Sequence, residues 1–200
     1  MKKGNVSSAC DDLLENGLKN IINKGFYNTS IKEIVDDSNV PKGSFYYYFP
    51  NKESFCCNVI KQYCNCDYHG CYQVLRNTSL SPVLRLRRYF ECLIEFYEKN
   101  DFTQGCLLGN LSLEMADTSD VIKQQLKISF SKWEQDVCEI LLESIKIGEI
   151  SSSINASSLA SFCINSWEGA LVRMKTEKSI VPLQIFINTI FKQFLCSKHT

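Results

Sequence analysis

The residues best suited to chemistry with a partner molecule lie between positions 41 and 52, where small, hydroxyl-bearing and basic side chains flank an aromatic run. Phe45 and Phe49 are four residues apart, so on a short helix they would share one buried side. The opposite side then carries Gly43, Ser44 and Tyr47. A glycine adds no bulk and a hydroxyl can hydrogen-bond base edges, so this strip is suited to the major groove of DNA.

Side chains that flank this strip are suited to contact DNA phosphates, and such contacts position a protein on the duplex without reading its sequence. Lys52 opens the next predicted helix, where its ammonium group and exposed backbone N–H groups could hold a phosphate. The complete set of predicted DNA-binding residues is Thr29, Ser30, Lys42, Gly43, Ser44, Tyr46, Tyr47, Tyr48 and Lys52. The alternative is an ordinary helical hairpin whose tyrosines fill a core.

The elements that must position these residues are two short helices joined by a tight turn. Ser30 can cap the first helix, at about 31–38, with Glu33 completing a capping box. The second helix begins at about Pro41, because proline suits a first helical position. A preceding helix over 6–24, ended by Gly25, would support the pair.

The stretch closely resembles the helix-turn-helix of TetR-type transcriptional regulators. The matching residues are Gly25, Phe26, Thr29, Ser30, Ile31, Ile34, Lys42, Gly43, Ser44, Phe45, Tyr46, Tyr47, Tyr48, Phe49, Asn51, Lys52 and Glu53. The resemblance implies an all-α protein with an N-terminal three-helix DNA-binding domain, residues 1–51, and a C-terminal helical ligand-binding and dimerisation domain, residues 52–200. It also implies a homodimeric repressor whose partner is double-stranded operator DNA.

The composition agrees with an all-helical chain, but the net charge gives little support to DNA binding. The 200 residues include only four prolines and nine glycines, and apolar residues recur three or four apart over long stretches. The 22 basic residues equal the 22 acidic ones, so DNA binding would depend on where individual lysines lie. No signal peptide or membrane span is recognisable, and we expect a cytoplasmic protein without a cofactor.

The eleven cysteines should then be reduced. A long helix is predicted over 52–76, and further helices over 82–99, 105–117, 119–147, 155–175 and about 182–196. On the first of these, Cys64, Cys66, His69 and Cys71 offer an alternative, a metal-responsive repressor, although their spacing does not match a closed zinc site. Small buried cysteines are the simpler interpretation.

The last two predicted helices are apolar on more than one side, and small residues would let another helix approach closely. We therefore expect them to pair with their copies in a four-helix dimer interface. The predicted interface residues are Phe162, Ser166, Ala170, Phe186, Ile190 and Phe194.

Two segments of the C-terminal half, GCLLGNLSLEMAD and WEGALVRMKTEKS, resemble the NemR-like, electrophile-responsive sub-group of TetR-type regulators. This resemblance implies that Cys106 and Lys175 are a sensing pair for a small-molecule or electrophile effector. A helix start and a nearby ammonium would both lower the pKa of a thiol. Two alternatives remain: Cys106 only packs, or it is the nucleophile of an enzyme. We expect no enzyme, because neither histidine, His69 or His199, lies near a recognisable catalytic motif.

Overall fold

The computed structural model describes residues 9–65 and 67–195, and every regular element within them is helical. This confirms the predicted all-α fold. Contacts between residues group the chain into two compact units, which are discontinuous in sequence. The first comprises the described residues up to 65 with Leu107–Ser129, and the second comprises residues 67–106 with those from 130 onward.

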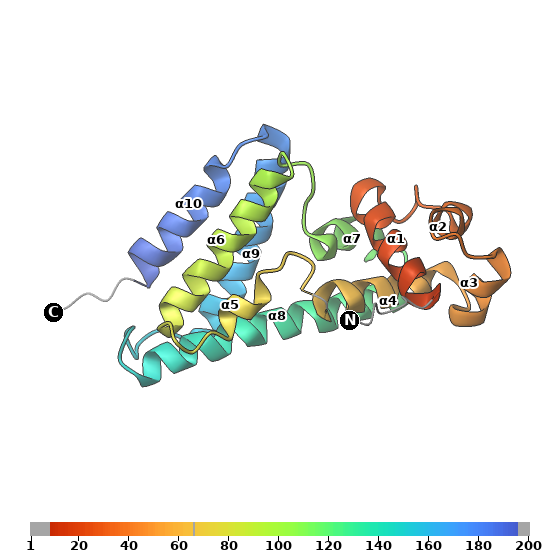
Figure 1. The fold of residues 1–200 in the computed structure, drawn as a ribbon. Helices are drawn as coiled ribbons and strands as arrows, with labels where there is room; N and C mark the ends of the chain where they lie inside the picture. The colour runs from red at the N-terminus through yellow and green to blue at the C-terminus, as the bar shows by residue number, and fades with distance from the viewer. Residues whose placement is uncertain (1–8, 66, 196–200) are drawn as a thin grey trace, which may run out of the picture. The chain divides into compact units, whose positions relative to one another are not determined.

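The first unit contains the three predicted N-terminal helices, two further whole helices and part of a third (Figure 1). Its helices are α1 (Ala9–Lys24), α2 (Ile31–Asp37), α3 (Lys42–Tyr48), α4 (Lys52–Asn65), α7 (Leu107–Met115) and the first part of α8 (Asp120–Lys146). Gly25 has a φ of +85° and ends α1, as predicted. The predicted start of that helix, residues 6–8, lies outside the described residues.

The second unit is built on long helices that bury a shared aromatic core. Its elements are α5 (Tyr72–Leu75), α6 (Pro82–Lys99), the rest of α8, α9 (Ala156–Glu177), α10 (Val181–Thr189) and a π-helical turn, η1 (Ile190–Phe194). Phe90 of α6 packs against Trp167 of α9 and Phe186 of α10, with ring centroids 5.0 and 4.8 Å apart. Figure 1 shows α6, α9 and α10 running side by side.

The predicted continuous helix over 52–76 is wrong. After α4 the backbone turns at Asp67 and Gly70, whose φ angles are +48° and +70°, in the left-handed region. The Asp67 carboxylate then accepts hydrogen bonds from the backbone N–H groups of Cys71 and Tyr72, both at 2.8 Å, at the start of α5. Asp67 therefore satisfies donors at a helix start instead of continuing α4.

The expectation that every cysteine is reduced is wrong for one pair. Cys71 and Cys92 form a disulfide, with their Cα atoms 5.7 Å apart. Seven other described cysteines carry reduced thiols: Cys10, Cys56, Cys57, Cys64, Cys106, Cys138 and Cys163.

No helix in the described part of the chain is both long and apolar enough to span a membrane.

Candidate nucleic-acid interface and buried polar cluster

Local hydrogen bonds fix the start of α2 as the sequence predicts. The Ser30 hydroxyl accepts from the Glu33 backbone N–H at 3.1 Å, and the Glu33 carboxylate accepts from the Ser30 backbone N–H at 2.8 Å. Lys24 donates to the same carboxylate at 2.9 Å. These bonds, with that from the Ser30 backbone the strongest, lower the pKa of Glu33 to about 2. The capping box is therefore formed, and it sets where the helix-turn-helix begins.

The buried side of α3 anchors it to the first unit. Phe45 and Phe49 are buried, and their ring centroids lie 5.2 and 4.9 Å from that of Phe55 in α4. This confirms the predicted division of the helix into a buried aromatic side and an outward side. Pro41 is the N-cap and not the first helical residue, so α3 begins at Lys42, one residue later than predicted.

The outward side of α3 is open to solvent. Tyr47 is 83% exposed, and a Cβ placed on Gly43 would have no heavy atom within 4 Å. Of the other predicted DNA contacts, Ser30, Lys42, Tyr46 and Tyr48 are exposed and Ser44 is half-buried. The alternative in which the tyrosines fill a core is therefore wrong, because Tyr46, Tyr47 and Tyr48 all lie at the surface.

Two predicted DNA contacts are used inside the molecule. Thr29 is fully buried, and its hydroxyl donates to the Gly25 carbonyl at 2.8 Å, so a direct side-chain contact with DNA is excluded in this conformation. Lys52 is half-buried: its ammonium donates to the Phe26 carbonyl at 2.5 Å and lies 4.2 Å from the centroid of the Phe26 ring. Burial lowers the pKa of Lys52. In this structure the Lys52 ammonium therefore binds the turn between α1 and α2.

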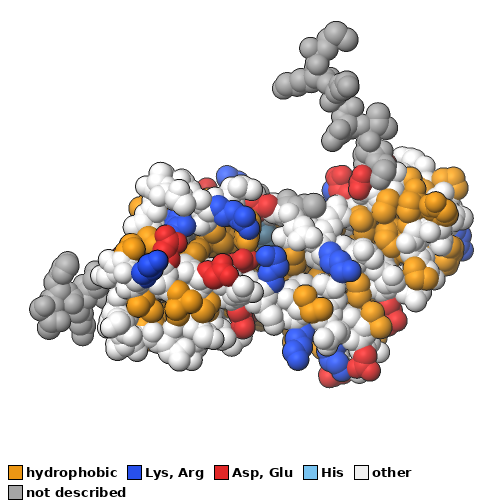
Figure 2. Space-filling view, turned by 90° about the horizontal axis from the view of Figure 1, so that it is seen from below, with side chains coloured by type: hydrophobic (Ala, Val, Ile, Leu, Met, Phe, Trp, Pro, Cys, Tyr) orange, Lys and Arg blue, Asp and Glu red, His pale blue; other side chains and the backbone are white. Residues whose placement is uncertain are grey.

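Figure 2 shows acidic and basic side chains interspersed on the visible face, and hydrophobic ones, with tyrosine counted among them, gathered in patches. This pattern agrees with the net charge of zero. A DNA contact by α3 would thus depend on a few placed side chains and on backbone N–H groups.

A buried polar cluster lies inside the second unit and consists of His69, Tyr97, Cys106 and Glu168. The Cys106 thiol donates a hydrogen bond to the Glu168 carboxylate. The Tyr97 hydroxyl lies 3.3 Å from His69 Nε2. Glu168 Oε1 is buried and has no hydrogen-bond partner among the described residues. Such an orphaned acceptor is rare in folded proteins and marks a place where a water or a ligand group would be stabilised.

Burial controls the ionisation of this cluster. It raises the pKa of Glu168 to about 7, although the hydrogen bond from Cys106 opposes that rise. It lowers the pKa of His69 to about 4 and raises the pKa of Tyr97 well above its ordinary value. Near neutral pH the cluster thus contains a neutral histidine and a carboxyl group close to its midpoint, the condition that suits proton exchange.

The members of the predicted sensing pair have different surroundings. Cys106 is buried beside Glu168, whereas Lys175, near the end of α9, is exposed. A neighbouring carboxylate disfavours a thiolate, whereas the predicted neighbouring ammonium would favour one. Sequence reasoning missed Glu168, and its only signal was an acidic residue between apolar neighbours of α9.

The described residues of the metal-site alternative do not form a metal-binding cluster. Cys71 is bonded to Cys92, His69 lies against Tyr97, and Cys66 lies outside the described residues. Within the described ranges, no three His, Cys, Asp or Glu side chains are placed to hold a metal.

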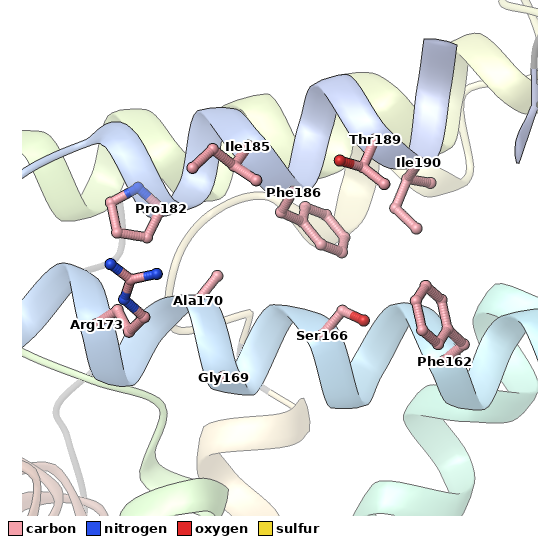
Figure 3. A pocket seen from close by; sticks show the side chains of 10 residues that line it. All are labelled: Phe162, Ser166, Gly169, Ala170, Arg173, Pro182, Ile185, Phe186, Thr189 and Ile190. Atoms are coloured by element: carbon pink, nitrogen blue, oxygen red, sulfur yellow. The ribbon is translucent and has the colours of Figure 1, made fainter. Parts of the chain in front are cut away.

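A groove of about 280 Å³ runs along the surface between α9 and α10 (Figure 3). We call it the α9–α10 groove. Small residues of α9 face apolar residues of α10 across it. Its lining comprises Phe162, Ser166, Gly169, Ala170, Arg173, Pro182, Ile185, Phe186, Thr189 and Ile190.

The predicted interface residues divide into two groups around this groove. Phe162 and Phe194 are 46% and 45% exposed, and their ring centroids lie 5.6 Å apart. Ser166 and Ala170 are half-buried. Phe186 and Ile190 line the groove but are only 5% and 1% exposed, so most of their surface is already buried in the core of a single chain.

Both the N-terminal and the C-terminal part of the chain match families of known proteins. Residues 13–56 match the family described as bacterial regulatory proteins, tetR family, and residues 82–190 match the one described as tetracyclin repressor-like, C-terminal domain. The HTH-type transcriptional repressor DhaR of Mycobacterium sp. (strain GP1) is 34% identical over 185 residues, covering 92% of this chain and 91% of DhaR.

Two solved structures share the fold. The regulatory protein TetR from Rhodobacter sphaeroides matches with a TM-score of 0.83 and 33% identity, over 92% of this chain and 97% of that one. The HTH-type transcriptional repressor NemR of Escherichia coli (strain K12) is 23% identical over 92% of each chain, and its reduced form matches with a TM-score of 0.78, over 90% of this chain and 94% of that one. The chain therefore belongs to the TetR family of helix-turn-helix transcriptional regulators, whose members bind operator DNA and act as dimers.

Proposed function

We propose that this protein is a homodimeric repressor that binds operator DNA through α3 and is released by a small molecule or by electrophilic modification of Cys106. The observation that carries the DNA-binding part is the outward side of α3, where Gly43 lies in open space and Tyr47 is 83% exposed. An exposed helix without bulk at its start can enter a major groove, and the flanking tyrosines can reach phosphates.

The α9–α10 groove supports the homodimer. Phe162 and Phe194 leave apolar surface exposed beside small residues, which is the composition expected where helices from two copies pack closely. A two-fold dimer would place two copies of α3 against half-sites one turn of DNA apart. An operator for this protein should therefore be a palindrome or close to one.

The buried polar cluster is the proposed effector site. As the sulfur of Cys106 forms a bond to an electrophilic alkene carbon, the thiol proton would pass to the Glu168 carboxylate, which already accepts a hydrogen bond from it. The other alkene carbon then takes up that proton, which Glu168 returns through water, so the carboxylate is regenerated. Lys175, exposed on α9, stays the proposed second member of the sensing pair.

Release follows from a difference in affinity between two forms of the dimer. If the modified or effector-bound form holds the two α3 helices at a spacing that does not fit the operator, DNA affinity falls by the free energy separating the forms. A few kcal/mol is enough to empty an operator.

The test is a titration of operator binding with N-ethylmaleimide. The operator is a duplex that wild-type protein selects from a random-sequence pool. We expect treatment to weaken wild-type binding at least about tenfold, the change produced by roughly 1.4 kcal/mol. Cys106→Ser should bind before treatment and resist it.

Cys163→Ser is the matched control, because Cys163 is also a buried thiol of the second unit, and burial raises its pKa to about 12. This variant should respond as the wild type does. Identical curves for wild type and Cys106→Ser would refute the electrophile response, and failure to select any duplex would refute DNA binding.

A further inference from the structure

Glu114, in α7, makes two hydrogen bonds to a turn that lies almost ninety residues earlier in the chain. Its carboxylate accepts from the backbone N–H of Phe26 at 2.8 Å and from that of Tyr27 at 2.7 Å. Both amides belong to the turn between α1 and α2. We call this arrangement the Glu114 clasp, and all of its atoms lie within the first unit.

The same turn is shaped to receive the carboxylate. Gly25 adopts a φ of +85°, and a Cβ at that position would lie 2.8 Å from Glu114 Oε2. A side chain at residue 25 would therefore both strain the backbone and displace the carboxylate. The glycine that ends α1 is also the residue that lets Glu114 approach.

Two further contacts hold the turn. Lys52 of α4 donates to the Phe26 carbonyl at 2.5 Å. The Tyr27 hydroxyl donates to the Thr118 hydroxyl at 3.0 Å. The peptide group on each side of Phe26 is thus bound by a charged side chain, the N–H by Glu114 and the carbonyl by Lys52. Hydrogen bonds to charged groups are stronger and more directional than neutral ones.

The turn decides where the DNA-reading helices point. Three residues after Tyr27 comes Ser30, the N-cap of α2, and α2 leads through a short turn into α3. Because Glu114 fixes the directions of the backbone N–H groups at 26 and 27, it restricts the path of the backbone that leads into α2. A change at the turn would be carried to α3, because α2 and α3 pack against each other.

We propose that Glu114 is a positioning residue for DNA binding, which holds the turn at 25–27 and so keeps α2 and α3 in the form that fits an operator. This inference rests on the proposed function for its DNA readout. It also gives α7 a role in release, since α7 begins at Leu107, the residue bonded to Cys106. An effector event at Cys106 that displaces α7 would act on the turn through Glu114.

The experiment compares Glu114→Gln with Thr118→Val in the full-length protein. Glutamine offers one acceptor oxygen where two N–H donors must be satisfied, so one backbone hydrogen bond is lost together with the charge. Valine at 118 removes the hydrogen bonds of the Thr118 hydroxyl to Tyr27 and to the Met115 carbonyl, and it leaves both backbone hydrogen bonds to Glu114. Amide hydrogen exchange at Phe26 and Tyr27, measured without DNA, reports the clasp directly.

In Glu114→Gln we expect amide exchange at Phe26 or Tyr27 to accelerate about tenfold or more, and affinity for the selected operator to fall about tenfold. Release by N-ethylmaleimide should become correspondingly smaller in this variant. Thr118→Val should keep the protection of both amides and most of the operator affinity. Thermal unfolding of each variant separates a positioning effect from general loss of structure.

Three results would overturn the proposal: unchanged amide exchange in Glu114→Gln, accelerated exchange with wild-type operator affinity, or equal losses in Thr118→Val. If wild-type protein selects no duplex, the proposed function fails, and with it the DNA-positioning role. The exchange rates would still show whether Glu114 fixes the turn, so the two failures can be told apart.

Discussion

At the scale of single residues, burial strongly perturbs the ionisation of Glu168. Burial raises its pKa from 4.5 to about 7, so the folded protein holds this proton to higher pH than the unfolded chain does. The free energy of unfolding should therefore fall as pH rises from about 4.5 to about 7. Above that range the folded protein carries the full cost of a buried, partly unpaired carboxylate.

Glu168→Gln should remove this dependence, because an amide does not ionise. We expect the free energy of unfolding of the variant, relative to wild type, to be larger at pH 8 than at pH 5 by about 2 kcal/mol. Urea unfolding at the two pH values measures the difference. Any contribution from His69, whose pKa is about 4, is common to both proteins and cancels.

The exposed Glu139, which accepts only from Gln135 in the described contacts, supplies the control substitution. Glu139→Gln should shift the two stabilities equally. If Glu168→Gln and wild type show parallel pH dependence, the carboxyl group titrates normally and its proposed part in the effector site loses its basis.

At the scale of elements, local signals predicted a helix well where capping residues lie beside it. Ser30 and Glu33 are three residues apart, and the box they form starts α2 at the predicted place. The helix predicted over 52–76 failed because Asp67 binds two amide groups downstream, a contact that competes with continuing the helix. Gly70, inside the predicted span, was the sequence signal that the helix could be interrupted there.

A substitution in α3 tests DNA binding most directly. Gly43→Leu adds bulk at a position where a Cβ meets no neighbour, and leucine favours helix over glycine, so stability should stay equal or rise slightly. Operator affinity should fall at least about tenfold, because the added side chain would lie between α3 and the groove floor. Fluorescence anisotropy with the selected duplex measures the affinity.

A leucine placed elsewhere controls for added surface hydrophobicity. Gln135 is exposed on α8, and Gln135→Leu should bind the operator as wild type does. Wild-type affinity in Gly43→Leu would mean that this side of α3 does not approach DNA.

At the scale of the whole molecule, the sequence could indicate that the chain has two parts, but it could not show which helices belong to each part. The predicted division at residue 51 follows the order of the chain, and it stays a prediction about function. Contacts instead place α7 with the N-terminal helices, through residues such as Glu114 that have no local signal. Likewise Cys106 could be predicted to matter from resemblance, whereas its neighbour Glu168 is brought to it only by packing.

Assembly is the property on which two-site DNA recognition depends, and it can be tested at the α9–α10 groove. Phe162→Glu places a charge on a side chain that is 46% exposed in one chain and would be buried between two copies. Desolvating an unpaired charge should weaken dimerisation by about a hundredfold or more, giving monomers in sedimentation velocity and weaker operator binding. Leu142→Glu is the matched control, because Leu142 is 53% exposed on α8, outside the groove, and its charge should stay in water. Dimers in Phe162→Glu, or monomers in both variants, would show that the copies meet at another surface and that the spacing of the two α3 helices is set elsewhere.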